Sequence, residues 1–116
     1  MKVLLDHNMA VQISTLLIGH EVFTAKEMLW DLLENGDLLG AAEEHGFNVM
    51  VTGDKSIFYQ QNNRLRKIAL VVLSRNDWPS VEQRAEAIRA AISRASPGSY
   101  ELVPIPNQRN GIRPIE

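Results

Sequence analysis

Three aspartates in the sequence come shortly after an apolar run, at the point where a buried strand of a parallel sheet would end. They are Asp6, Asp54 and Asp77, which follow the runs at 3–5, 49–51 and 68–73. Because the carboxyl ends of parallel strands meet at one edge of a sheet, these side chains are expected to lie near that edge. Neighbouring carboxylates repel one another, and a bound cation relieves the repulsion. The pattern therefore indicates a site for Mg²⁺ or Mn²⁺, which prefer oxygen ligands.

Each of these carboxylates, and Asp37 with them, has a structural alternative as the cap of a helix. Asp6 and Asp54 both precede segments that could form short helices. Asp77 stands before a Trp-Pro-Ser sequence, which favours capping over metal binding. Asp37 follows the turn signal Asn35-Gly36 and opens a helical pattern, so capping is also its favoured role in isolation. Taken singly, the residues do not decide between caps and ligands.

The elements that must position these side chains are visible in the hydrophobic pattern. The three runs are apolar throughout, which is typical of strands buried on both faces. Helical spacing lies between or after them, at 11–17, at 38–42 before Gly46, and from Pro79 to Ile92. Weaker strands are predicted at 21–23 and at 100–103, the latter at an edge. The alternation predicts an α/β fold, a three-layer α/β/α domain over residues 1–103 with a mainly parallel central sheet.

Length and composition fit one ordinary domain. The 116 residues are 45% hydrophobic and 22% charged, and no apolar run approaches the roughly 20 residues of a membrane span. The formal net charge of -2 argues against a strong nonspecific binder of duplex nucleic acid. The absence of cysteine excludes disulfides, iron–sulfur clusters and thiolate zinc sites. The first residues lack the apolar stretch of a secretory signal, so a cytoplasmic protein is expected.

Two further segments are polar or irregular. Residues 104–116 contain prolines, a glycine and no periodicity, so they are expected to form an extended tail that is ordered only against another subunit or a partner. After Asp54 the chain becomes polar with basic flanks. This stretch is either an ordinary exposed surface or a contact for the phosphates and bases of single-stranded RNA. The basic residues are Lys55, Arg64, Arg66 and Lys67, and they surround Tyr59-Gln60-Gln61-Asn62-Asn63.

Four short motifs follow one another along the chain. They are Leu4-Leu5-Asp6-His7-Asn8-Met9, Gly19-His20-Glu21-Val22, Asn35-Gly36-Asp37-Leu38-Leu39 with Ala42 and Gly46, and Val51-Thr52-Gly53-Asp54. In this order they resemble the opening motif, second strand, central helix and VTxD turn of the PIN-like domain family known as DUF5615. That family is related to the Mut7-C domain and to PIN-domain toxins. The resemblance covers most of residues 1–103.

The resemblance implies a PIN-like metal-dependent ribonuclease, the toxin-like component of a toxin–antitoxin pair. Asp6, Asp37 and Asp54 would form the acidic cluster that binds Mg²⁺ or Mn²⁺ and supports hydrolysis of RNA phosphodiester bonds. The residues expected to support these ligands or to contact the substrate are His7, Asn8, Thr52, Lys55, Ser56 and Asn76. RNA would be the substrate, an antitoxin protein a partner, and a homodimer is a further expectation.

Three positions depart from the family pattern, and each lacks a carboxylate. His7 stands where an acid usually follows the first aspartate, and Ser56 replaces the second aspartate of a TxDxD turn. Asn76 stands where a fourth carboxylate could serve. Fewer carboxylates predict weaker metal binding. A PIN-like module without catalysis, which binds RNA or a protein partner, is therefore the main alternative.

A receiver-like phosphoacceptor domain is the other alternative. It would also place acids after two of the apolar runs, and Ser74 follows the next run as such a domain requires. It normally needs an acidic pair where Asp6-His7 stands, and a lysine after the last strand, where the chain has Pro104-Ile105-Pro106. These two departures rank it below the other interpretations.

Overall fold

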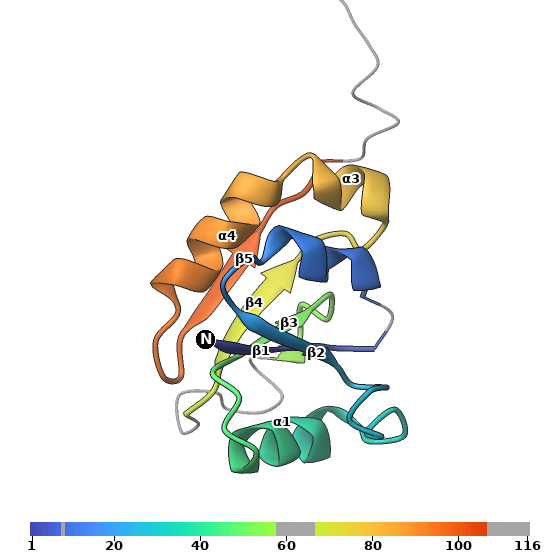
Figure 1. The fold of residues 1–116 in the computed structure, drawn as a ribbon, viewed down its shortest axis with the longest axis vertical. Helices are drawn as coiled ribbons and strands as arrows, with labels where there is room; N and C mark the ends of the chain where they lie inside the picture. Colours follow the sequence, from blue (N-terminus) through green and yellow to red (C-terminus); the bar gives the residue numbers. More distant parts are fainter. Residues whose placement is uncertain (8, 58–66, 107–116) are drawn as a thin grey trace, which may run out of the picture.

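The three apolar runs form the centre of a five-stranded sheet (Figure 1). A computed structural model describes residues 1–7, 9–57 and 67–106 of the chain. The central strands are β1 (Lys2–Leu5), β3 (Val49–Thr52) and β4 (Ala69–Leu73), whose side chains are almost all buried. The outer strands are β2 (Glu21–Thr24) and β5 (Tyr100–Val103), in the order β2-β1-β3-β4-β5. Every pair of neighbours is parallel, which confirms the predicted α/β fold.

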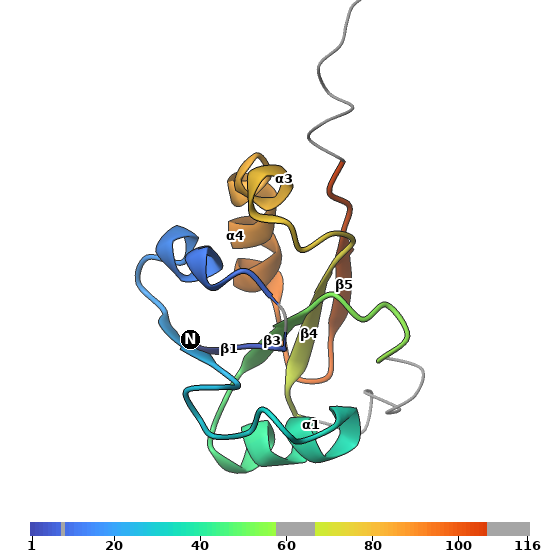
Figure 2. The same cartoon turned by 90° about the vertical axis from the view of Figure 1, so that its right-hand side faces the viewer.

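Helical segments pack against both faces of this sheet (Figure 2). They are η1 (Val11–Leu16), α1 (Asn35–Glu44), α3 (Trp78–Glu82) and α4 (Ala85–Arg94). Side chains alternate along each strand, so Leu5 contributes to one core cluster and Leu4 to another. The cluster that contains Leu5 is covered by η1, α3 and α4, and the cluster that contains Leu4 is covered by α1. The helices predicted on both faces are thus present.

The single helix predicted from Pro79 to Ile92 is two helices in the structure. α3 ends at Glu82 and α4 begins at Ala85, and the backbone leaves helical geometry at Arg84 (φ -117°, ψ 28°). α3 contacts η1, whereas α4 contacts β5. The break therefore lets the apolar side chains of the two helices pack against different elements. The helix predicted over 11–17 is a 3₁₀ helix. None of the helices in the described residues is long and apolar enough to cross a bilayer.

α1 begins earlier than the turn signal at 35–36 predicts. Glu34 is its N-cap, and the Leu38 amide donates to the Glu34 carbonyl at 2.7 Å. The two turn residues are therefore helical, and Asp37 lies in the first turn instead of capping it. A carboxylate in a first turn is favourable beside the positive end of the helix dipole. Gly46 follows the helix as predicted, with φ 80°.

The strand order changes direction between β1 and β3, which gives the sheet a topological switch point. From β1 the chain first adds β2 on one side and then crosses back to add β3 on the other. Loops that leave two neighbouring strands in opposite directions open a crevice there, where doubly wound sheets bind ligands. Asp6 follows β1 and Asp54 follows β3. The fold thus brings two carboxylates of the expected cluster to this switch point.

Residues 24–30, which begin at the last residue of β2, form one capped helical turn. At its start the Thr24 amide donates to Glu27 Oε1 (2.9 Å) and the Glu27 amide donates to Thr24 Oγ1 (3.0 Å), a capping box. At its end the amides of Leu29 and Trp30 donate to carbonyls of the preceding turn at 3.0 and 2.9 Å, the two bonds of a Schellman motif. This motif needs a left-handed residue, and Leu29 supplies it with φ 62°. A leucine at a position that favours glycine costs stability.

The packed domain extends beyond the predicted boundary at Val103. Ile105 is 4% exposed and belongs to the core cluster that contains Leu5. Its amide donates to Ser74 Oγ at 2.6 Å, and this hydroxyl donates back to the Ile105 carbonyl at 3.3 Å. The expectation that residues from 104 onwards stay out of the core does not hold at Ile105, because periodicity cannot detect a lone apolar side chain. The rest of the predicted tail, 107–116, lies outside the described residues.

Replacing Leu29 with glycine should stabilise the fold by about 1 kcal/mol, because glycine adopts a positive φ without the steric cost of a Cβ. Unfolding in urea, followed by circular dichroism, measures the change. Leu32→Gly is the matched control: Leu32 is 91% exposed, but its φ is not positive, so there the same substitution should lower stability. A Leu29→Gly variant less stable than the wild type would show that the leucine side chain outweighs the backbone strain.

Ile105→Ala should lower the free energy of unfolding by about 2–4 kcal/mol, the usual cost of removing a buried isoleucine side chain. Leu102→Ala serves as its control, because Leu102 is 43% exposed and should cost much less. The same urea titration compares them. Equal losses in the two variants would contradict the packing of Ile105 into the core.

Candidate functional site

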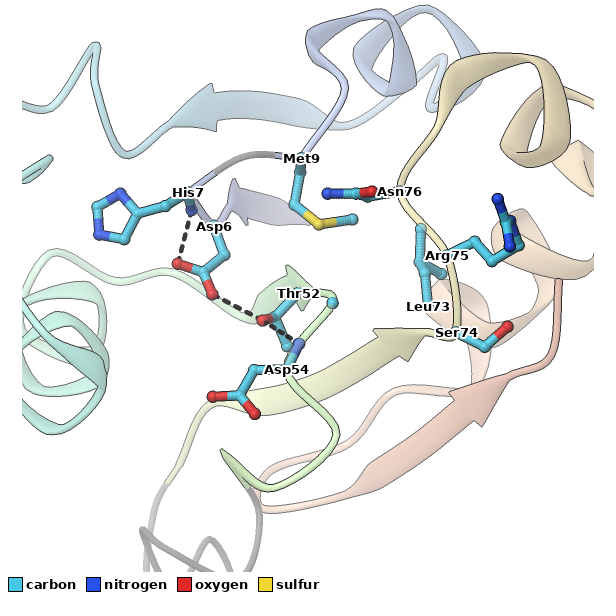
Figure 3. A pocket seen from close by; sticks show the side chains of 10 residues that line it. Asp6, His7, Met9, Thr52, Asp54, Leu73, Ser74, Arg75 and Asn76 are labelled. Carbon is cyan, nitrogen blue, oxygen red and sulfur yellow. Dashed lines mark hydrogen bonds between the residues drawn. The ribbon is translucent and has the colours of Figure 1, made fainter. Parts of the chain in front are cut away.

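A cavity of about 410 Å³ opens at the carboxyl ends of β1, β3 and β4 (Figure 3). Asp6, His7 and Met9 line it after β1, residues 52–54 line it from β3, and residues 73–76 line it after β4. The cavity therefore lies at the switch point between β1 and β3 and extends over the neighbouring β4.

Thr52 joins the two carboxylate-bearing loops through its hydroxyl. It is the last residue of β3 and is fully buried. Its Oγ1 donates to Asp6 Oδ2 at 2.6 Å and accepts the Asp54 amide at 3.1 Å (Figure 3). A hydroxyl has one proton to donate and lone pairs to accept with, so Thr52 uses it in both roles. The carboxylate of Asp6 and the backbone of Asp54 are therefore held in a fixed relation.

The two carboxylates differ in what holds them. Asp6 Oδ1 accepts the His7 amide at 2.7 Å, so each oxygen of Asp6 accepts a hydrogen bond from a described residue. Asp54 Oδ1 accepts both the amide and the hydroxyl of Ser56, at 3.0 and 2.7 Å. An aspartate that accepts the amide two residues later is typical of a helix cap. Asp54 therefore accepts the kind of hydrogen bond that the capping alternative predicts. This bond is compatible with metal binding, because a carboxylate oxygen can accept more than one contact.

His7 ties the end of β1 to the segment before α1. Its Nε2 lies 2.9 Å from the carbonyl oxygen of Leu33. Because a carbonyl can only accept, Nε2 is the donor in this contact. The ring points away from Asp54 (Figure 3). His7 therefore supports the loop with its ring and orients Asp6 with its amide.

The third carboxylate of the expected cluster, Asp37, does not line this cavity. It is exposed in the first turn of α1. In the part of the chain that the structure describes, no three acidic or histidine side chains come close enough to hold one metal ion. Of the three expected ligands, Asp6 and Asp54 therefore line this cavity and Asp37 does not.

Asp77, the third acid after an apolar run, occupies the N-cap position of α3, as its sequence context favours. Ser80 Oγ donates to its Oδ2 at 2.5 Å, and Arg75 Nε donates to its Oδ1 at 2.8 Å. The hydrogen bond from Ser80, together with Arg75, holds the pKa of Asp77 below its ordinary value. Arg75 lines the cavity, but its guanidinium is turned away from Asp6 (Figure 3).

A second cavity, of about 540 Å³, shares Asp6, His7 and Met9 with the first. Its other wall consists of Val11, residues 24–26 and Asp31, from η1 and the segment after β2. Sequence reasoning missed this cavity because the segment has no hydrophobic period. The spacing of Thr24 and Glu27, which is that of a capping box directly after a strand, is the signal that could have located the turn.

The remaining predicted site residues fall into three groups. Asn76 is exposed and lines the first cavity. Lys55 and Ser56 are exposed and do not line it. Asn8, Gln60, Gln61, Asn62 and Arg64 lie outside the described residues.

Thr52→Val should lower the free energy of unfolding by about 1–3 kcal/mol, because valine keeps the shape of the side chain but leaves the Asp6 carboxylate and the Asp54 amide without their shared partner. Thr52→Ser keeps the hydroxyl and is the control; it should lose about 1 kcal/mol, for one methyl group. Thermal unfolding at neutral pH compares the three proteins. If Thr52→Val matched the wild type, the two hydrogen bonds would contribute no net stability.

Comparison of the chain with family models, with curated proteins and with solved structures gives no match. The resemblance to the PIN-like family therefore stays a prediction, carried by the four motifs alone. Function has to be inferred from the geometry of the two cavities and of the residues that they share.

Proposed function

We propose that the chain is a PIN-like metal-dependent ribonuclease that cleaves RNA phosphodiester bonds in the cavity over β1, β3 and β4. One observation carries the proposal: the Thr52 hydroxyl links two carboxylate-bearing strand ends at the switch point of a parallel sheet. Carboxylates at such a point are suited to hold a cation against a phosphate. The resemblance of the four motifs to the PIN-like family supports the same function.

Asp6 and Asp54 fit a magnesium or manganese ion that keeps several of its waters. Mg²⁺ is commonly held by one or two carboxylates together with substrate phosphates, and not by a full cage of protein ligands. The cavity volume of about 410 Å³ leaves room for water and a phosphate. When bound, the ion would neutralise charge on the scissile phosphate and lower the pKa of the attacking water.

The side chains around the carboxylates prepare the site before a ligand arrives. Thr52 and the His7 amide orient Asp6, and Ser56 orients Asp54. Asn76, at the rim, offers an amide suited to a phosphate oxygen or a ribose hydroxyl. Groups that are already oriented need little rearrangement when the substrate binds, which lowers the barrier to reaction.

A role as the toxin-like half of a toxin–antitoxin pair belongs to this proposal, as do a cytoplasmic location, an antitoxin partner and a homodimer. The support for the toxin role is the resemblance to PIN-domain toxins. A gene for a small antitoxin-like protein directly upstream would add to that support.

A PIN-like module that binds RNA or a protein partner without cutting is the second candidate. The position of Asp37 favours it, because two carboxylates line the cavity where the resemblance implies three. The receiver-like alternative loses support, since the Ser74 hydroxyl is bonded to the backbone of Ile105. In a receiver this hydroxyl would have to face the phosphorylated aspartate.

Cleavage of synthetic single-stranded RNA in Mn²⁺, and its loss in EDTA, tests the proposal. Asp6→Asn and Asp54→Asn should each lower the cleavage rate by about 100-fold or more, since replacing even an outer partner of a metal ligand costs about 10- to 100-fold. Both variants should also bind Mn²⁺ more weakly in calorimetry. Equal Mn²⁺ affinities for the wild type and Asp54→Asn would show that the carboxylate acts only as a cap.

Two matched aspartate variants sharpen the result. Asp77→Asn lies at the same edge of the sheet, but Ser80 and Arg75 hold its carboxylate, so it should cleave like the wild type. Asp37→Asn tests whether the site uses three carboxylates, as the resemblance implies, or the two that line the cavity. Loss of cleavage would assign Asp37 a role in the RNA complex, and unchanged cleavage would limit the site to Asp6 and Asp54. A wild type that binds RNA in Mn²⁺ without cutting it would favour the second candidate.

A further inference from the structure

The two cavities lie on either side of the end of β1. Asp6, His7 and Met9 line both of them. One cavity extends over β3 and β4, and the other extends towards β2, because β1 stands between β2 and β3 in the sheet. A carboxylate of the proposed nuclease site therefore has ligand-sized space on both sides. A mononucleotide needs one such space, whereas a strand that continues past the scissile phosphate needs both.

The second cavity has the mixture of surfaces that a nucleotide needs. Val11 and Ala25 provide apolar wall, and Val11 is 59% exposed. Thr24 and Asp31 provide oxygen atoms that suit the polar edge of a base, and Lys26 provides a positive charge. Single-stranded nucleic acids are recognised by this combination of base packing, contacts to base edges and phosphate pairing.

The backbone that carries Lys26 is fixed at both ends. Lys26 stands between Thr24 and Glu27, whose side chains and amides form the capping box. Its carbonyl accepts the Leu29 amide at 3.0 Å in the Schellman motif. The exposed ammonium is thus carried on a rigid turn, which reduces the entropy lost when it contacts a phosphate.

We propose that the second cavity is a nucleotide subsite, in which Lys26 contacts the phosphate next to the scissile bond and the Val11 surface carries the neighbouring base. This inference rests on the proposed ribonuclease function and adds that the site holds nucleotides on both sides of the scissile bond. A base that packs on Val11 must be unpaired, which favours single strands over duplexes. With a net charge of -2, the chain depends on such local contacts for binding RNA.

Variants at the rim of the cavity test the subsite with a fluorescent eight-nucleotide oligouridylate. Binding is measured by anisotropy in Ca²⁺ and cleavage in Mn²⁺. Lys26→Gln should weaken binding about two- to fivefold, the contribution of one exposed ionic contact, and lower the slope of log affinity against log salt by about 0.7. Val11→Glu should weaken binding, because it removes the apolar surface that carries the base and adds a charge that repels the phosphates.

Arg94→Gln is the control, because Arg94 is exposed at the end of α4, before β5, and so lies at the opposite edge of the sheet; it should leave affinity and salt slope unchanged. Substrate length gives an independent readout. The wild type should cleave the eight-nucleotide RNA with a lower KM than a dinucleotide. Lys26→Gln should reduce this difference by raising KM for the longer RNA while kcat stays the same, since Lys26 touches no reacting atom.

The outcomes separate the subsite from the ribonuclease function. If the wild type cleaves RNA and Lys26→Gln and Val11→Glu keep its KM and salt slope, the subsite is overturned and the ribonuclease stands. A wild type that neither binds nor cleaves RNA overturns both. Variants that keep RNA cleavage but lose binding to a protein partner would assign the cavity to that partner, which also overturns the nucleotide subsite.

Discussion

The buried hydroxyl of Thr52 is the contact on which the candidate site depends. Every other side chain of β3 is apolar, and a hydroxyl buried in such surroundings without partners would cost about 1–3 kcal/mol. Thr52 avoids this cost because Asp6 accepts its proton and the Asp54 amide donates to its oxygen. Strand register makes the arrangement possible: Leu5 pairs with Val51, so the residues that follow β1 meet the end of β3. The same bonds that satisfy the hydroxyl therefore also bring the two acidic loops together.

Contacts between side chains and backbone hold the other loops at this edge. His7 reaches the carbonyl of Leu33 before α1, and Ser74 exchanges hydrogen bonds with the backbone of Ile105 after β5. The capping box of residues 24–27 fixes the turn after β2. Each contact restrains a loop that has no sheet ladder of its own. The rims of both cavities are thus preformed, although regular secondary structure ends before them.

The sheet and half of the site could be predicted because buried parallel strands leave a local mark in the sequence. A short run that is apolar at every position is typical of a strand buried on both faces, and Asp6 and Asp54 meet because each follows such a run. The position of Asp37 could not be predicted in the same way. It depends on where α1 begins, and helix boundaries are set by contacts that propensity does not encode. Ile105 and the second cavity were missed because a lone side chain and an irregular turn have no period.

Several residues of the chain break local rules of sequence and structure. Thr52 is polar in a buried strand, Leu29 has a left-handed backbone, and Leu32 is an exposed leucine. At the amino edge, Lys2 Nζ donates to the His45 carbonyl at 2.6 Å, where α1 ends, and lies over the Phe47 ring, whereas Ile18, just before β2, is 88% exposed. Natural sequences depart from local consistency mainly where function constrains them. Selection for stability alone would place glycine at position 29 and a polar residue at position 32. Of these three departures, Thr52 lines a cavity, and its hydroxyl is also the contact that joins Asp6 to the backbone of Asp54.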